Sequence, residues 1–220
     1  MAFFQDDSLK RRDVIIIGGG LMGCAIALRL TQKGQKVTIL RRSFQEAAGL
    51  AAAGMLAPEA EGLGAGPMRD LCLLSRDRYH TYSKDLEALT GEAIGYLPTG
   101  IIAPFYPGQT ATHDASTYRS RQELLAVQPG LGDEVTGGWW FPKDGQVDNR
   151  RLMRSLQVAL NQLHVEQIDG VTVERIVTEG ERITLLETSQ GPWQAEHYVL
   201  ATGAGPRICC PCLWCRVRGS

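Results

Sequence analysis

The sequence predicts an α/β fold in which a parallel sheet forms one layer and a partial β-rich domain forms another. The first observation is a strand, a helix and a second strand within residues 13–40, an arrangement that makes the two strands parallel neighbours. The second observation is the middle section, roughly residues 91–141, which interrupts the alternation of helices and strands. We therefore assign residues 13–90 and 142–204 to one domain and residues 91–141 to part of a second.

Short apolar runs and glycines define the first three elements. Residues 13–18 are apolar and β-branched and end in glycine, which is typical of a buried parallel strand. Residues 21–33 show helical spacing of apolar side chains, and Gly34 supplies a stop. Residues 36–40 form the second buried strand.

Capping and turn signals predict the remaining elements. Pro67 stands at a favoured first-turn position and opens a long helix that ends at Gly91. Asp148 is the N-cap of a helix that runs to about Leu163. The expected apolar face of the first of these helices is Leu71, Leu74, Tyr79, Tyr82, Leu86 and Leu89. Other expected elements are strands at 96–105, 138–141 and 193–201, a short helix at 118–128, and a hairpin of 171–177 with 182–188.

Composition and charge exclude several classes of protein. The 23 basic and 24 acidic side chains give a net charge of -1, which provides no basic face for nucleic acid. No segment reaches the roughly 18 apolar residues that a membrane-spanning helix needs, and the N-terminus lacks the apolar core of a signal peptide. We expect a cytoplasmic protein with no nucleic-acid or membrane partner. The four histidines lack metal-ligand spacing, so no metal is expected.

A glycine-rich segment follows the first strand and carries the main functional signal. In the pattern Gly-x-Gly-x-x-Gly, Gly18 permits a tight turn, Gly20 lets the backbone approach a pyrophosphate, and Gly23 lets the helix pack on the strand. The free N–H groups and the dipole at the helix N-terminus attract phosphates. The candidate dinucleotide-binding residues here are Gly18, Gly19, Gly20, Leu21, Met22 and Gly23.

Two arginines follow the second strand, where a dinucleotide site usually has an acidic residue that holds ribose hydroxyls. Arg41 and Arg42 are compatible with an NADP site, in which arginine meets the 2′-phosphate. They are also compatible with an FAD site that contacts the adenosine, or with a solvated charge pair at a strand end. Position alone leaves these three readings open.

Three further segments resemble one protein family. They are Ala-Ala-Ala-Gly-Met-Leu-Ala within residues 51–61, Gly-Gln-Val-Asp at 145–148, and Tyr-Val-Leu-Ala-Thr-Gly at 198–203. Together with the glycine-rich unit they resemble the D-amino-acid-oxidase family of flavoproteins, and within it the glycine oxidases of thiamine biosynthesis. The resemblance covers roughly residues 13–204, and it implies a glutathione-reductase-like, FAD-binding parallel sheet with a substrate domain at 91–141.

The resemblance implies FAD as the cofactor and extends the candidate site. A loop of small residues lies near the flavin in this family, the backbone of Val171 meets adenine, and the last strand returns beneath the dinucleotide. Arg41 takes the position that is acidic in many members, which puts the adenosine contact in doubt but not the fold. The additional candidates are Arg41, Arg42, Ala48, Gly49, Ala53, Gly54, Met55, Val171, Ala201, Thr202 and Gly203.

The resemblance also implies an activity, which is oxidation of glycine or a similar small amine to the imine with reduction of O₂ to H₂O₂. The partners are then the amine or amino-acid substrate and O₂, with a homo-oligomer as one state of the full-length protein. No residue of this chain is assigned a catalytic role, because the arginine that clamps the substrate carboxylate belongs to the other half of the family's chain. The alternatives are an NADP-dependent reductase and an inactive truncated fragment.

After Ala204 the sequence changes character. Cys209, Cys210, Cys212 and Cys215 crowd into a loop too short to surround one tetrahedral zinc ion. One permitted back-translation, read one base earlier, gives a Leu- and Pro-rich continuation of the kind that the family has. We therefore expect residues 205–220 to be a non-native tail from a shifted reading frame, and the chain as written to be inactive.

Overall fold

The computed structural model describes residues 12–110 and 113–203, which form two compact units. Among these residues, one unit consists of 12–52 and 153–203, and the other of 53–152. The predicted assignment of residues 13–90, 142–204 and 91–141 to an FAD-binding and a substrate domain stays a prediction. The predicted tail at 205–220, with its cysteines, lies outside the described residues.

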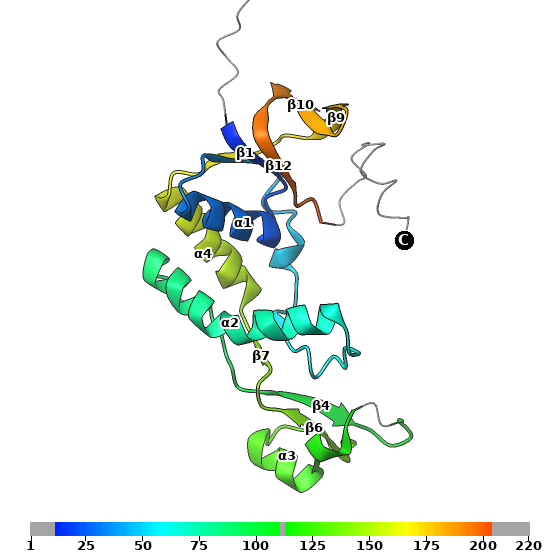
Figure 1. Ribbon diagram of the computed structural model, residues 1–220. Helices are drawn as coiled ribbons and strands as arrows, with labels where there is room; N and C mark the ends of the chain where they lie inside the picture. The colour runs from blue at the N-terminus through cyan, green and yellow to red at the C-terminus, as the bar shows by residue number, and fades with distance from the viewer. Residues whose placement is uncertain (1–11, 111–112, 204–220) are drawn as a thin grey trace, which may run out of the picture. The chain divides into compact units, whose positions relative to one another are not determined.

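A four-stranded parallel sheet forms the centre of the first unit (Figure 1). Its strand order is β12-β1-β2-β8, where β1 is Arg12–Ile17, β2 is Val37–Leu40, β8 is Glu166–Ile168 and β12 is Ala195–Leu200. Each adjacent pair runs parallel, which confirms the predicted sheet. The sequence analysis missed β8, because its three residues, Glu-Gln-Ile, contain no apolar run.

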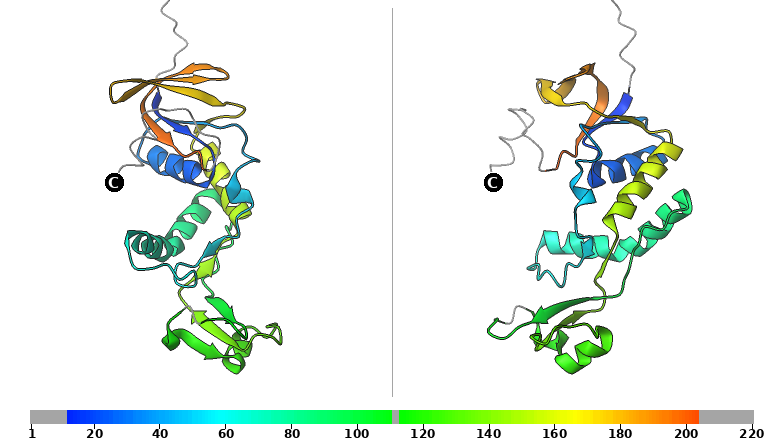
Figure 2. Two further views of the ribbon diagram at one scale, coloured as in Figure 1. Left: turned by 90° about the vertical axis from the view of Figure 1, so that its right-hand side faces the viewer. Right: turned by 180° about the vertical axis from the view of Figure 1, so that it is seen from behind.

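One part of the core of this unit lies between the parallel sheet and an antiparallel one. The antiparallel sheet, in yellow and orange in Figure 2, consists of strands β9 (Val173–Glu179), β10 (Arg182–Thr188) and β11 (Gly191–Trp193). Its apolar side chains join those of β1 and β2 because alternate residues of each strand face inward. The buried cluster consists of Ile15, Ile17, Leu40, Val171, Val173, Ile176 and Leu186.

Two helices accompany the sheet of the first unit. Helix α1 (Leu21–Gln32) connects β1 to β2 and ends where Gly34 adopts a left-handed φ of 84°, as predicted. Helix α4 (Asn149–Gln162) begins at the predicted cap, since the Asp148 carboxylate accepts backbone N–H bonds from Arg150 and Arg151. Because this cap satisfies N–H groups that the first helical turn leaves free, it fixes the start of α4.

The second unit contains a long helix, two small antiparallel sheets and one short helix. Helix α2 (Pro67–Thr90) starts at Pro67 and ends at Gly91 with φ 73°, as predicted. One sheet pairs β3 (Met55–Leu56) with β7 (Gly145–Gln146). The other has the order β4-β6-β5, and α3 (Arg121–Val127) follows β5. Its strands are β4 (Ile101–Phe105), β5 (Tyr118–Ser120) and β6 (Gly137–Phe141), and the short 3₁₀ turns are η1 (Ala48–Leu50) in the first unit and η2 (Ala115–Thr117) in the second.

Four predicted elements differ from the structure. The expected strand at 96–105 begins only at residue 101, as β4. Residues 118–128 divide into β5 and α3, because the Ser120 side chain caps the helix together with Glu123. Residues 193–201 divide into β11 and β12. The predicted apolar face of α2 is wrong at its start, since Leu71 and Leu74 are 61% and 50% exposed.

The described residues contain no helix with the length and apolarity that a membrane crossing requires. The predicted cytoplasmic location stays a prediction.

Candidate functional site

The glycine-rich loop lies at the edge of the parallel sheet where all four strands end. The Gly18 N–H donates to the carbonyl oxygen of Leu40 at 2.8 Å, and the Ala201 N–H donates to the carbonyl oxygen of Ile17 at 2.8 Å. These bonds hold the loop between the ends of β2 and β12. Ligands of open parallel sheets bind at this carboxyl edge.

The three motif glycines meet different surroundings, and the difference fits a bound phosphate. A Cβ on Gly18, whose φ is 113°, would lie 2.3 Å from the Ala201 carbonyl oxygen, and a Cβ on Gly23 would lie 1.9 Å from that of Gly18. Both positions therefore require glycine for the fold. A Cβ on Gly20 would meet nothing within 4 Å. The open space beside Gly20, at the N-terminus of a 12-residue helix, fits the pyrophosphate that the motif predicts.

The neighbouring candidates of the first unit pack around this helix start. A Cβ on Gly49 would lie 3.0 Å from Met153 Sδ and 3.5 Å from Leu21 Cβ, so η1 packs closely between α4 and α1. The carbonyl oxygen of Ala48 accepts N–H bonds from the next turn and closes η1. Met22 is 64% exposed at the start of α1. Ala48, Gly49, Leu21 and Met22 therefore lie together with the glycine-rich loop.

Arg41 donates four hydrogen bonds to other side chains, which the sequence could not show. Its Nε and Nη2 donate to the two carboxylate oxygens of Asp169 at 2.7 and 3.1 Å. Its Nη1 donates to side-chain oxygens of Gln157 and Gln167 at 3.1 and 3.0 Å, and only 9% of the Arg41 side chain is exposed. A Cβ on Gly19 would lie 2.4 Å from Arg41 Cδ, so the stem of Arg41 covers the loop.

Arg42 differs from Arg41, because its side chain is about half exposed and pairs with Glu46 at 3.4 Å. The Gly170 N–H donates to the Arg42 carbonyl oxygen, and the Val171 N–H donates to that of Arg41. Val171 is therefore beside Arg41, and an adenine contact by its backbone would use its carbonyl oxygen. Ala201 lies against Gly18, followed by Thr202 and by Gly203 with φ 60°.

The predicted flavin loop, Ala53, Gly54 and Met55, lies in the second unit. Gly54 has a φ of 80°, and a Cβ at this position would lie 2.0 Å from the carbonyl oxygen of Val147. The backbone N–H of Val147 donates to the carbonyl oxygen of Gly54 at 2.9 Å. This backbone position thus requires glycine, as a tight approach to β7 demands. The placement of the three residues beside a flavin stays a prediction.

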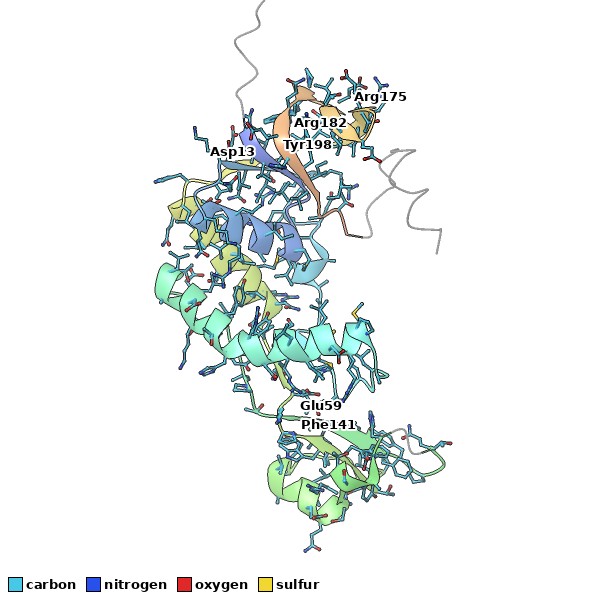
Figure 3. The ribbon with its side chains drawn as sticks, in the orientation of Figure 1. Asp13, Glu59, Phe141, Arg175, Arg182 and Tyr198 are labelled. Atoms are coloured by element: carbon cyan, nitrogen blue, oxygen red, sulfur yellow. The ribbon has the colours of Figure 1, made fainter. Side chains whose placement is uncertain are left out.

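A buried charge network, which was not predicted from the sequence, fixes the turn that follows this loop. Asp144, which is fully buried, accepts backbone N–H bonds from Glu59 and Ala60 at 3.1 and 2.9 Å. Arg76 of α2 donates to Asp144 at 2.8 Å and also pairs with Glu59, which Figure 3 labels. Glu59 and Asp144 are 17 and 68 residues away from Arg76 in the chain, so local spacing gives no signal for this network.

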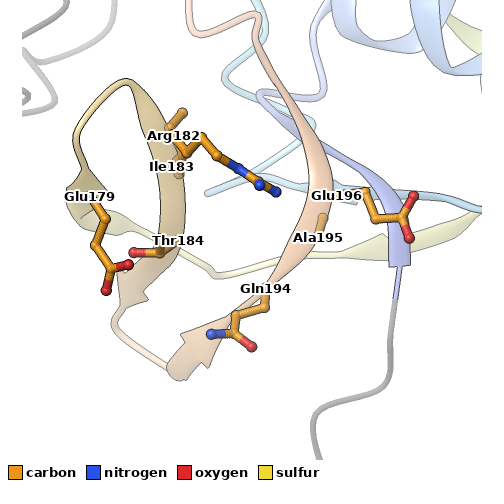
Figure 4. Close-up of a pocket in the computed structure, with 7 residues that line it drawn as sticks. All are labelled: Glu179, Arg182, Ile183, Thr184, Gln194, Ala195 and Glu196. Carbon is orange, nitrogen blue, oxygen red and sulfur yellow. The ribbon is translucent and has the colours of Figure 1, made fainter.

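A hollow of about 570 Å³ lies elsewhere in the first unit, beside the amino end of β12 (Figure 4). Since dinucleotides bind at the carboxyl edge of such sheets, we do not assign it to the cofactor. It is lined by Glu179, Arg182, Ile183, Thr184, Gln194, Ala195 and Glu196. Within residues 12–110 and 113–203, no three His, Cys, Asp or Glu side chains gather as a metal site would require.

Comparisons with known proteins agree with this geometry. The sequence matches the family described as DAO, FAD dependent oxidoreductase, over residues 13–216. It is 49% identical over 197 residues to the Bifunctional protein ThiO/ThiG of Synechocystis sp., which covers 87% of this chain and 30% of that protein.

The solved structures extend the likeness to the fold. The crystal structure of glycine oxidase from Geobacillus kaustophilus superposes with a TM-score of 0.77 at 27% identity, covering 88% of this chain and 56% of that one. The glycine oxidase sequence of the same organism is 28% identical over 208 residues. The chain thus spans about half the length of these glycine oxidases and under a third of the ThiO/ThiG protein.

Proposed function

Since this chain belongs to the FAD-dependent oxidoreductase family, we propose that it forms the cofactor-binding part of a glycine-oxidase-like flavoenzyme. The observation that carries this proposal is a difference in the space beside the three motif glycines: it is empty at Gly20 and filled by backbone atoms at Gly18 and Gly23. Backbone atoms already fill the space beside the two closed glycines. The open one leaves room for a phosphate at a helix N-terminus.

The reaction we propose is the oxidation of glycine or a similar small amine, in support of thiazole formation in thiamine biosynthesis. The cofactor supplies the redox chemistry, which removes a hydride from the substrate α-carbon and delivers two electrons to O₂. The amine loses two electrons and two protons to become the imine, and O₂ takes up both to become H₂O₂. The protein contributes binding, orientation and electrostatics.

The residues of this chain divide that task. N–H groups of the Gly18–Gly23 loop and of α1 would hold the pyrophosphate, and Arg41 and Val171 would border the adenosine. The Ala201 N–H donates a hydrogen bond to the carbonyl oxygen of Ile17 and so holds the end of β12 against the glycine-rich loop. The turn after Met55 is fixed by Asp144 and Arg76, which supports a role for the 53–55 loop in positioning the flavin ring. A homo-oligomer stays a prediction.

The engagement of Arg41 argues against its use in the NADP-dependent alternative. A 2′-phosphate needs an arginine with free donors, whereas Arg41 already donates four hydrogen bonds from a nearly buried position. The comparisons support the same choice, since the family is described as FAD dependent and one relative is a glycine oxidase.

The test is a graft. Residues 13–203 would replace the matched region of the Synechocystis ThiO/ThiG protein, and H₂O₂ release with glycine would be measured alongside the visible flavin spectrum. We expect a yellow protein that releases H₂O₂ with glycine or a related small amine. A folded graft that carries flavin and ignores every small amine would overturn the proposed activity, and a colourless folded graft would overturn the proposed cofactor.

A further inference from the structure

The carboxyl edge of the parallel sheet carries an acidic residue on a strand where the motif does not place one. The residues that directly follow β12, β1, β2 and β8 are Ala201, Gly18, Arg41 and Asp169. Leu40 of β2 is level with Ile168 of β8, so Arg41 and Asp169 are the next pair along this register. Dinucleotide sites usually hold ribose hydroxyls with an acid at the end of the second strand. Here the acid follows the neighbouring strand.

The Arg41–Asp169 pair is oriented so that the acid faces solvent. Only 9% of the Arg41 side chain is exposed, against 58% of the Asp169 side chain. The guanidinium donates to both carboxylate oxygens of Asp169 and is itself held by Gln157 and Gln167. The Phe44 ring lies 5.1 Å from the guanidinium carbon, which adds a cation–π contact. Arg41 is thus a rigid support, and Asp169 is the group that it presents.

The charge state of Asp169 suits a hydrogen-bond acceptor. Hydrogen bonds from the Arg41 side chain hold the pKa of Asp169 below its ordinary value, so the group is a carboxylate at neutral pH. A carboxylate accepts about four hydrogen bonds. Arg41 supplies two and the backbone of Phe44 a third, which leaves capacity on an exposed oxygen.

We propose that Asp169 binds the adenosine ribose hydroxyls of the cofactor, and that Arg41 is the positioning residue that holds Asp169 there. The acid missing after β2 is thereby replaced by one that follows β8. A 2′-phosphate in the same place would face the Asp169 carboxylate and an arginine already neutralised by it. This inference rests on the proposed FAD binding and concerns only which residue recognises the ribose.

The experiment compares FAD with FMN, which lacks the adenosine half, using flavin fluorescence on the apoprotein of the full chain. Asp169→Asn should weaken FAD binding by about tenfold to a hundredfold, the range expected for a hydrogen bond to a charged group, and leave FMN binding unchanged. Arg41→Lys, which cannot make the bidentate pair, should weaken FAD in the same selective way. Glu187→Gln is the matched control, because Glu187 pairs with Arg175 on an exposed face of the same unit (Arg175 is labelled in Figure 3).

Unchanged FAD affinity in Asp169→Asn would overturn the inference. Equal losses for FAD and FMN would also overturn it, since they would mean a general disturbance of the fold. If the parent bound no FAD, the proposed function would fall, and ADP-ribose titration would then decide the ribose site by itself. Weaker ADP-ribose binding by Asp169→Asn than by the parent would uphold the inference. A parent that bound no ADP-ribose would overturn the inference together with the proposed function.

Discussion

Gly20 separates two roles that the glycine motif combines. A Cβ on Gly18 or on Gly23 would lie only 2.3 or 1.9 Å from a backbone carbonyl oxygen, whereas a Cβ on Gly20 would meet no atom within 4 Å. Gly20 also has extended backbone angles, with φ of -78° and ψ of -170°, which any residue adopts. The fold therefore does not require glycine at this position, and we expect it to serve the approach of a ligand.

Gly20→Val should abolish FAD binding while leaving thermal unfolding within about 1 kcal/mol of the parent, because the new side chain occupies only the phosphate space. Gly23→Ala should destabilise the fold itself, since the built Cβ overlaps a backbone oxygen. Gly64→Val is the control, because its surroundings are equally open and it belongs to the second unit. Circular dichroism melting and flavin absorbance measure the two effects. Full FAD binding by Gly20→Val would contradict the site.

Cys24 should be chemically silent in the native protein. It is fully buried in α1, its Sγ donates to the Gly19 carbonyl oxygen and accepts from Gln157, and burial raises the pKa of its thiol to about 11. Since the thiolate is the reactive form, Cys24 should resist iodoacetamide at about pH 8, while half-buried Cys72 reacts. Peptide mass spectrometry measures both. Equal labelling of the two in folded protein would contradict this burial.

The raised pKa of the Cys24 thiol predicts that the free energy of unfolding depends on pH in the alkaline range. Its pKa is raised from 9.0 in the unfolded chain to about 11 in the native state, so the unfolded chain releases its proton first as the pH rises. This group therefore lowers the free energy of unfolding as the pH rises from 9 towards 11 and has no such effect below pH 9. Urea unfolding of Cys24→Ala should show a shallower alkaline loss than the parent.

At the scale of elements, the Asp144–Arg76 pair joins α2 to the turns that flank β3 and β7. Both side chains are buried, and Asp144 also accepts two backbone N–H groups of residues 59 and 60. The first half of α2 thus buries the face that carries Arg76, and Leu71 and Leu74 lie on another face. The inward position is taken by Arg76, which needs its acidic partners.

Asp144→Ala should cost about 3–5 kcal/mol of unfolding free energy, because it leaves the Arg76 charge buried with fewer partners. The double variant Arg76→Met with Asp144→Ala should recover part of this loss, since no unpaired charge remains. Asp133→Ala, which removes the fully exposed partner of Arg121, should cost less than about 1 kcal/mol. Denaturant titration compares all three. An Asp144→Ala loss no larger than that of Asp133→Ala would refute the structural role of the network.

At the scale of the whole molecule, we expect a polypeptide of these 220 residues to release less H₂O₂ with glycine than the Synechocystis graft, even where it binds FAD. No described arginine of this chain is assigned to the substrate carboxylate, and losing such a buried charged contact costs about 2–5 kcal/mol. Peroxide release from the purified chain and from the Synechocystis graft, at equal flavin content, measures the difference. Comparable turnover in both would mean that the chain contains a complete substrate site.

The sequence by itself determined the parallel sheet, the glycine-rich loop, the ends of α1, α2 and α4, and the family. Each of these depends on local signals, such as apolar runs, caps, and glycines in fixed spacing, which act over a few neighbouring residues. It could not determine which of the motif glycines touch backbone, because the carbonyl of Ala201 comes from a strand at the other end of the chain.

Only the tertiary structure decided the roles of the charged residues. Arg41 is 128 residues from Asp169, and Arg76 is 68 residues from Asp144, yet each pair is within hydrogen-bond distance. Short strands such as β8 could not be predicted from the sequence either, because pairing with a neighbouring strand stabilises them and their own residues have little strand propensity. The physical reason is common to all of these cases. Ion pairs and sheet edges are contacts between distant segments, and their partners are chosen by the packing that brings those segments together.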